Sequence, residues 1–411
     1  MFEIALEQEN VERAASIKVI GVGGAGGNTV NSMIDADAQG IEFIVANTDA
    51  QALRMSKASV KIQIGVKLTK GLGSGAHPDI GRRAAEEDLE RILESVEDAD
   101  IVFLAAGMGG GTGSGALPII ARALKDRGIL SIATVTRPFL FEGKHRARIA
   151  QEAINLLAQE VDTLVVVANQ KLLETVDASV SMIDAFAMIN NVLYQSVKSI
   201  ADIIINPGHI NVDFADLRTI MKDMGLAVMG TGHACGSQRA QEAALQAIAS
   251  PLLENMSIAG ARGILLNITG GIDLGLHEIN EAASIIREQA AEDANIIIGS
   301  VIDQNLQDEV KITVIATGFQ QHSTTKQVST PELLVKATTK DRSIEKTPPI
   351  EHTQVPVEIQ NTTKVSPLET PKYSSMESTI VIPREEPMGT SEILDDFDVP
   401  AFMRKEELGN R

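Results

Sequence analysis

Short apolar runs alternate with amphipathic stretches over the first 320 residues of the chain. Five runs rich in β-branched residues are apolar on both faces, which is typical of buried strands. Helical periodicity separates them, most clearly over 78–96 and 142–161. This alternation predicts a parallel sheet that is covered by helices on both faces. The predicted strands are 17–22, 42–47, 100–106, 129–136 and 163–169.

A longer helical pattern follows, over 179–205. Its apolar residues recur every three or four positions, at Met182, Phe186, Ile189, Leu193 and Val197. A helix of that length measures roughly 40 Å, enough to cross a domain. After it, a second α/β unit is predicted, with a helix near 237–249 and strands near 226–231, 263–269, 295–302 and 309–317.

The pattern ends near residue 320. Only two of the 33 glycines, Gly389 and Gly409, follow that point. Residues 321–390 are rich in Thr, Pro, Lys and Glu, with scattered apolar residues that cannot bury enough area to offset the chain entropy. We predict a disordered linker there. The last segment, "EILDDFDVPAFMRK" at 392–405, gathers apolar residues again and is interpreted as a docking peptide.

Composition narrows the class of protein. The chain has 411 residues, 44% of them apolar, and a net charge of −19. That charge disfavours a nucleic-acid binder, so any anionic ligand must be held locally. A single cysteine, Cys235, excludes a disulfide framework. The sequence has no signal-peptide pattern and no apolar run of the roughly 20 residues that a membrane helix needs. We therefore expect a cytoplasmic protein without direct membrane insertion.

Three glycine clusters carry the first candidate chemistry. They are "GVGGAGGN" at 21–28, "KGLGSGAHP" at 70–78 and "GMGGGTGSG" at 107–115. A strand, a glycine loop and a helix turn several backbone N–H groups toward one point at the positive end of the helix. A phosphate is the natural occupant, because only glycine lets its oxygens approach the backbone.

A nicotinamide enzyme is the alternative for the first cluster. Gly21, Gly23 and Gly26 satisfy G-x-G-x-x-G, and Asp49 follows the second predicted strand. Two further clusters indicate a longer polyphosphate that is held from several sides. The sequence contains no G-x-x-x-x-G-K-[ST] motif and no pair with zinc-ligand spacing.

The second constellation is "NVDFADLR" at 211–218. Asp213 and Asp216 are spaced as a helix N-cap with an acidic first turn, or as two carboxylates that position a water molecule. Both can hold at once. The long helix, however, separates these carboxylates from the glycine loops by most of a domain, so one chain is not expected to bring them together.

The order of these motifs resembles the FtsZ family, the bacterial tubulin relatives that form the division ring. The matching segments cover 16–320 and 392–405, and the G-G-G-T-G-[ST]-G signature is the most specific among them. They are "GVGGAGGN", "NTDAQAL", "GLGSGAHPDIGRRAAEE", "AAGMGGGTGSGA", "RPFLFEGKHR", "SMIDAF", "NPGHINVDFADLRTIM" and "DVPAFMRK".

The resemblance implies a tubulin/FtsZ-like α/β fold. A Rossmann-like parallel-sheet domain would bind GTP, and a long central helix would join it to a second α/β domain that carries the catalytic loop. The implied segments are a flexible N-terminus at 1–15, the GTP-binding domain at 16–178, the helix at 179–205, the second domain at 206–320, the linker at 321–390 and a partner-binding tail at 391–411.

It also implies a GTPase whose active site is shared between subunits. GTP or GDP, with Mg²⁺ carried by the nucleotide, would lie on the glycine loops of one subunit, and the loop with Asn211, Asp213 and Asp216 would come from the next. Glu142 would accept from the ribose, Arg146 would reach the ribose or α-phosphate, and Phe186 would pack on the base. The implied phosphate, sugar and loop contacts are Gly24, Ala25, Gly26, Gly27, Asn28, Gly73, Gly109, Gly110, Gly111, Thr112 and Gly113.

One position departs from the family. Many relatives have an Asp in the pair before "VL" on the long helix, where this chain has Asn190 and Asn191. An amide can accept from guanine N1–H and donate to O6, but it cannot accept twice as a carboxylate does. Asn190 is thus the expected base contact, or a surface polar residue.

The resemblance implies partners and a location as well. The chain would form a head-to-tail homopolymer at the midcell ring beneath the inner membrane. Residues 392–405 would bind membrane-tethering and regulatory division proteins. A non-catalytic scaffold stays as a further alternative, although Asp213 and Asp216 are present and count against it.

Overall fold

The computed structural model describes residues 15–177, 179–205, 210, 212–253, 258–304 and 306–319. All of them lie in one unit of the chain, Met1–Gln327. Asn211, the predicted linker and the predicted tail lie outside the described residues, as does nearly all of the predicted N-terminal segment.

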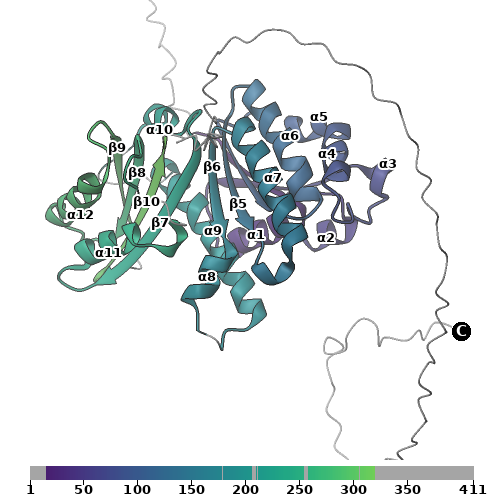
Figure 1. Ribbon diagram of the computed structural model, residues 1–411. Helices are drawn as coiled ribbons and strands as arrows, with labels where there is room; N and C mark the ends of the chain where they lie inside the picture. Colours follow the sequence, from purple (N-terminus) through teal and green to yellow (C-terminus); the bar gives the residue numbers. More distant parts are fainter. Residues whose placement is uncertain are drawn as a thin grey trace, which may run out of the picture. The chain divides into compact units, whose positions relative to one another are not determined.

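The first half of the fold is a parallel sheet with the strand order β3-β2-β1-β4-β5-β6 (Figure 1). The five predicted strands are confirmed to within one residue at each end. The short edge strand β3 was not predicted, because two of its four residues are polar and only Ile62 is buried. The bounds are β1 Ile17–Val22, β2 Ile41–Asn47, β3 Val60–Gln63, β4 Ile101–Gly107, β5 Leu130–Arg137 and β6 Thr163–Ala168.

Helices cover this sheet, and one predicted helix is wrong. The stretch 78–96 forms two helices, α4 and α5, which meet at Asp88. The Asp88 side chain accepts from Gly65 N at 2.8 Å and pairs with Arg91, which holds the chain in a non-helical turn. The bounds are α1 Gly23–Asp35, α2 Ala50–Met55, α3 Val66–Thr69, α4 Pro78–Glu87, α5 Leu89–Glu94, α6 Thr112–Asp126, η1 Leu140–Glu142, α7 Lys144–Glu160 and α8 Asn169–Thr175.

The long helix is α9, Met182–Ile205. Its 24 residues span about 36 Å. Ile189, Leu193 and Val197 are buried, as their spacing predicts, whereas Met182 is 69% exposed at the first turn. Among the described residues, the apolar stripe therefore continues to the start of α9 without being covered there.

The second half continues the sheet instead of forming a separate one. Thr163–Val165 of β6 pairs with 225–227 of β7, giving ten strands in one sheet. Beyond β7 the order is β10-β8-β9, with β10 antiparallel to both neighbours, so this half is mixed. The bounds are α10 Phe214–Met221, β7 Gly225–Cys235, α11 Arg239–Ile248, η2 Pro251–Leu253, β8 Gly263–Gly270, α12 Leu276–Gln289, β9 Asn295–Ile302 and β10 Glu309–Thr317.

One core cluster ties the two halves together around α9. Val197 and Ile200 of α9 pack in the same cluster as Val30 of α1 and as Leu265 and Ile315 of the second half. The helix therefore fixes the start of α1, where the first glycine cluster lies, relative to the second half of the sheet.

Candidate functional site

The three glycine clusters meet at the carboxyl ends of β1 and β4. A Cβ on Gly23 would lie 3.2 Å from Gly113 N, and one on Gly107 would lie 2.7 Å from the Ala25 side chain. The second cluster joins through Ser74, whose hydroxyl lies 3.0 Å from that of Thr112. The structure thus brings together loops that are up to about 90 positions apart in the sequence, as the shared phosphate site requires.

The glycines of these loops serve two different purposes. Gly26, Gly111 and Gly113 are close to the chain itself: a Cβ there would come within 2.3 Å of Ala105 O, 2.3 Å of Ser74 Oγ and 2.8 Å of Gly107 O. Gly24 and Gly110 have no heavy atom within 4 Å of such a Cβ. The sequence reasoning gave one explanation, a close ligand, to all of them. In the structure, the first three are glycine because other parts of the chain pack against them. At the other two the space beside the backbone is open, so a ligand could lie there.

Two helices begin at this open face without a side-chain cap. α1 starts directly after β1, and α6 starts at Thr112, and neither N-cap residue offers a side-chain hydrogen bond. The first N–H groups of a helix have no intrahelical acceptor and carry the positive end of its dipole. An anion that lies between the two helix starts would accept from both. This can hold phosphate in a chain of high negative charge without a cluster of lysines.

A row of buried hydroxyl groups fixes the third loop. Thr48 Oγ1 lies 2.7 Å from Thr112 Oγ1, which in turn lies 3.0 Å from Ser74 Oγ, and all three residues are buried. Ser114 Oγ accepts from Gly109 N at 2.9 Å. The Thr112 hydroxyl is therefore committed to its neighbours, and its backbone N–H belongs to the uncapped first turn of α6. Gly73, at φ +84°, precedes Ser74 and donates its N–H to Thr48 O at 3.3 Å.

Glu142 and Arg146 form an ion pair with each other beside the third loop. Arg146 Nη1 contacts Glu142 Oε2, while Glu142 Oε1 accepts from Phe139 N at 2.8 Å. The backbone oxygen of Arg146 would lie 2.9 Å from a Cβ on Gly109, so the start of α7 borders the glycine loop directly. The sequence analysis expected each residue to contact nucleotide and did not anticipate that they pair with each other.

The first turns of α9 supply the remaining predicted contacts. The Phe186 ring meets the buried Phe139 ring edge-on at 5.6 Å. One turn later, Asn190 Oδ1 accepts from Thr29 Oγ1 of α1 at 3.3 Å. Both residues lie on the face of α9 that borders α1, so an aromatic surface and an amide stand beside the glycine loops.

Asn169 is a candidate that the sequence analysis missed. It follows β6 directly and is buried, and its Oδ1 has no hydrogen-bond partner among the described residues. A buried carbonyl oxygen without a donor is costly, so its position at the carboxyl end of a parallel strand favours a ligand contact. The signal was available in the sequence, since the five apolar residues 164–168 are followed directly by this polar residue.

Asp213 and Asp216 lie at the opposite end of the same strands. Asp213 caps α10, accepting from Ala215 N at 3.3 Å, and both carboxylates are exposed. Arg218 of this helix donates to Gly128 O, just before β5, at 2.9 Å. A strand of the eight residues of β5 is about 26 Å long. In Figure 1, α10 lies at the upper edge of the sheet, and α8, which follows β6, lies at the lower edge.

Asp49 does not behave as the acid of a nicotinamide site. Its Oδ1 accepts from Gln51 N at 2.8 Å and from Ala52 N at 3.2 Å, so it caps α2. The remaining support for that alternative is the glycine pattern alone.

The described residues hold neither a metal-ligand cluster nor a membrane-spanning helix. In that part of the chain no three His, Cys, Asp or Glu side chains are grouped so that they could hold a metal ion. None of its helices is both long enough and apolar enough to cross a bilayer.

The chain is similar to known proteins over nearly its whole length. The profile of the Tubulin/FtsZ family GTPase domain matches residues 16–177, and that of the FtsZ family C-terminal domain matches 225–320. "Cell division protein FtsZ" of Pseudomonas aeruginosa is 45% identical over 99% of this chain and 100% of its own. That of Coxiella burnetii is 50% identical over 79% of this chain and 83% of its own.

Solved structures agree with the fold. An empty FtsZ dimer from M. jannaschii is 41% identical, with a TM-score of 0.71 over 75% of this chain and 90% of that one. CetZ2 from Haloferax volcanii, at 21% identity, shares the fold with a TM-score of 0.63 over 74% of this chain and 94% of its own.

The hydroxyl row predicts a stability effect at Thr112. Thr112→Val keeps the volume but removes the hydroxyl between Thr48 and Ser74, leaving two buried hydroxyls without that partner. We expect the free energy of unfolding, measured in urea without nucleotide, to fall by about 1–3 kcal/mol. Thr112→Ser retains the hydroxyl and should lose less. A Thr112→Val chain as stable as the wild type would show that these hydroxyls do not hold the loop.

Proposed function

Because the chain belongs to the FtsZ family of tubulin-like GTPases, we propose that it acts in cell division by assembling head-to-tail into filaments and hydrolysing GTP where two subunits meet. Its membership in the Tubulin/FtsZ GTPase family makes it a GTP-binding, GTP-hydrolysing enzyme.

The nucleotide pocket is proposed at the carboxyl ends of β1 and β4. The backbone N–H groups at the starts of α1 and α6 hold the phosphates, with the open faces of Gly24 and Gly110 nearest to them. The Glu142–Arg146 pair lies on the ribose side, Phe186 packs against the base, and Asn190 and Asn169 contact the base edge. Mg²⁺ would enter with the nucleotide and spread the charge of its phosphates.

The catalytic carboxylates come from the next subunit in this proposal. The observation that carries it is the placement of the glycine loops and of Asp213 and Asp216 at opposite ends of the same parallel strands. Stacking two copies along the strand direction brings the acidic turn of one onto the pocket of the other. Asp213 caps its own helix, whereas Asp216 has no side-chain partner in the described part of the chain. Asp216 is therefore the better group to orient the attacking water.

An apolar surface beside the pocket supports this stacking. Leu140, Phe141, Met182 and Ile183 are between 69% and 78% exposed, at η1 and at the first turn of α9. Exposed apolar side chains that cluster in this way usually mark an interaction surface. Their place next to the glycine loops fits a contact that closes the pocket as it forms.

The tail is proposed to recruit filaments to the membrane. Residues 392–405 lie outside the described part of the chain, so this argument rests on their sequence alone. A linker of ~70 residues spans about 45–50 Å, enough to reach an adaptor. Weak single tails would act together on one filament by avidity. Location at the midcell ring follows from such an adaptor.

Hydrolysis should depend on protein concentration. Because one subunit supplies the pocket and another the carboxylates, turnover per subunit should be near zero below a threshold and rise above it. Phosphate release and light scattering, followed together over a dilution series with GTP and Mg²⁺, measure both events. Turnover per subunit that stays constant down to the lowest concentration would contradict a shared site.

Two inactive variants should restore each other. Asp216→Asn keeps the pocket and should bind GTP, but hydrolyse it about 10²–10⁴-fold more slowly. Gly110→Ala places a methyl group on the open face of the pocket but keeps the acidic turn. Mixed in equal amounts, they should recover part of the activity, because the pocket of the first meets the carboxylates of the second.

The double variant Gly110→Ala/Asp216→Asn is the matched control for this mixture. Combined with either single variant, it creates no junction that has both an intact pocket and an intact Asp216, so activity should stay low. If the two single variants fail to restore each other while each still assembles with the wild type, the carboxylates act within one chain.

Removing residues 392–411 should leave hydrolysis and assembly nearly unchanged and abolish recruitment. The test is co-sedimentation of filaments with vesicles that carry a membrane-anchored division partner. Equal recovery of full-length and truncated protein with the vesicles would place the membrane link elsewhere in the chain.

A further inference from the structure

The acidic turn of α10 has few backbone ties to the first half of the sheet. α10 carries Asp216, has Asp213 as its cap and is eight residues long, Phe214–Met221. The strand that follows it, β7, pairs with β6 over three residues only. A side chain that orients an attacking water molecule must be placed to within about 1 Å. Side-chain contacts that hold α10 are therefore important for the chemistry proposed above.

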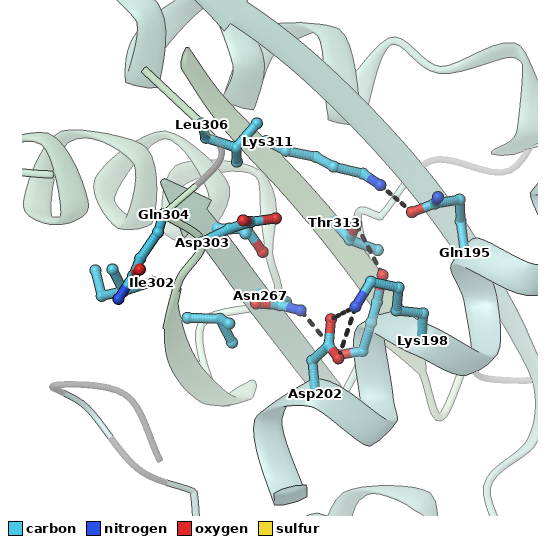
Figure 2. A pocket seen from close by; sticks show the side chains of 13 residues that line it. Gln195, Lys198, Asp202, Asn267, Ile302, Asp303, Gln304, Leu306, Lys311 and Thr313 are labelled. Carbon is cyan, nitrogen blue, oxygen red and sulfur yellow. Dashed lines mark hydrogen bonds and ion pairs between the residues drawn. The ribbon is translucent and has the colours of Figure 1, made fainter. Parts of the chain in front are cut away.

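Polar side chains of α9, the helix before α10, contact other elements. Lys311 of β10 donates to Gln195 of α9, and Lys198 pairs with Asp202 within the helix (Figure 2). The first of these contacts joins α9 to the second half of the sheet, and the second stabilises α9 itself. Neither contact involves α10, so the directional contacts that place α10 come from another element.

Apolar packing keeps α10 on the core without fixing its exact place. Leu217 and Ile220 are buried in the core cluster that also contains α9. Apolar contacts are non-directional, so a short helix can shift or turn on them at small cost. A crevice of about 40 Å³ remains where α10 meets the start of β5, and Asp162, directly before β6, lines it. Directional contacts at this crevice remove that freedom.

Two buried residues at the start of β6, Asp162 and Thr163, hold the end of α10. The Thr163 hydroxyl donates to the backbone oxygen of Met221, the last residue of α10. Asp162 Oδ1 accepts from Asp223 N at 3.4 Å, and the backbone oxygen of Asp162 accepts from Gly225 N at 2.9 Å. The first half of the sheet thus contacts the helix end, the turn after it and the first residue of β7.

The Asp162 carboxylate is itself fixed by β5. Ser131 donates both its backbone N–H and its hydroxyl to Asp162 Oδ2, each at 2.9 Å. One carboxylate oxygen therefore binds β5, and the other binds the turn after α10. Moving α10 away would leave a buried charged oxygen without its donor, which is costly. Asp162 thus holds the two elements in one relative position.

We propose that Asp162, assisted by Thr163, is a positioning residue for the carboxylate that orients the attacking water. Through the turn at Asp223 it sets the place of α10, and so of Asp216, relative to the rest of its own subunit. It acts in the subunit that supplies the carboxylate and not in the subunit whose nucleotide is hydrolysed. This inference rests on the proposed function, in which two subunits share one site.

Two substitutions loosen these contacts without touching the pocket. Asp162→Asn keeps the volume and an acceptor for Ser131, but it turns an amide donor toward Asp223 N. Thr163→Val keeps the shape and removes the donor to Met221 O. In each full-length variant, GTP affinity measured by calorimetry should stay within about twofold, whereas turnover at saturating GTP should fall about tenfold or more, because small displacements far from the reacting atoms can cost that much.

Asp100→Asn is the matched control. Asp100 directly precedes β4 at the same edge of the sheet, and its Oδ2 accepts from Ser16 N at 2.8 Å, within the first half. The same substitution there also weakens a hydrogen bond between a carboxylate and the backbone, but it leaves the contacts of α10 unchanged. Turnover of Asp100→Asn should therefore stay near that of the wild type. Urea unfolding of all the variants separates loss of stability from loss of position.

Mixing experiments locate the effect in one of the two subunits. Asp162→Asn combined with Gly110→Ala forms junctions in which an intact pocket meets a correctly placed Asp216. Activity should therefore exceed the sum of the two proteins measured separately at the same concentrations. Asp162→Asn combined with Asp216→Asn forms only junctions with a displaced or a missing carboxylate, so activity should stay low. A residue that only stabilised the fold would not distinguish the two mixtures.

Three results would overturn this role of Asp162. They are unchanged turnover of Asp162→Asn and Thr163→Val, an equal loss in Asp100→Asn, and recovery with Asp216→Asn in place of Gly110→Ala. If Gly110→Ala and Asp216→Asn fail to restore each other, the shared site is wrong and this inference falls with it. If they restore each other while Gly110→Ala does not restore Asp162→Asn, the shared site stands and only the positioning role is wrong. Should Asp162→Asn fail to fold, Thr163→Val takes its place in each mixture.

Discussion

The parallel direction of β1, β4, β5 and β6 determines what one copy of this chain can do. All four strands end at the edge of the sheet where the glycine loops lie, and they begin at the edge where α10 lies. The pocket gains two uncapped helix starts from this arrangement, and the acidic turn is placed about one strand length away from it. The parallel direction of the strands, which places the helix starts at the proposed phosphate site, therefore also places the carboxylates of α10 at the opposite edge of the sheet. On the proposed assignment of the site, a complete active site needs two copies, and assembly is a condition of the chemistry.

Charge explains why the pocket is made of backbone. A chain with a net charge of −19 repels a polyphosphate at long range. Backbone N–H groups that point at an anion attract it only at contact distance. Unlike lysine or arginine, they add no charged side chain that would have to be desolvated or neutralised. Glu142 and Arg146 likewise add no net charge beside the pocket, because the two side chains form an ion pair with each other. The site can thus hold an anion while adding little net charge to the protein.

Much of this architecture was predictable from local pattern. The five strands of the first half, the long helix and the three glycine loops all follow from periodicity and residue type. What could not be predicted depends on contacts between distant segments. Asp88 breaks a good helical pattern because Gly65, twenty-three positions earlier, supplies a donor. Gly111 must be glycine because the Ser74 side chain lies against it. Asn169 and Asn267 stand out only because their buried side-chain oxygens have no hydrogen-bond partner among the described residues, which the sequence does not reveal. Met182 fits the apolar stripe of α9 in sequence, yet the described part of the chain leaves it 69% exposed.

The seam between β6 and β7 has a mechanical consequence. Neighbouring strands elsewhere in the sheet pair over four to eight residues, but this pair meets over three. A sheet bends most readily at its narrowest join, so torque applied to the two ends of a subunit concentrates there. α10 lies at that join, next to the start of both strands. In a stack of subunits this seam recurs once in every copy, so any rotation at it would be repeated along the whole filament.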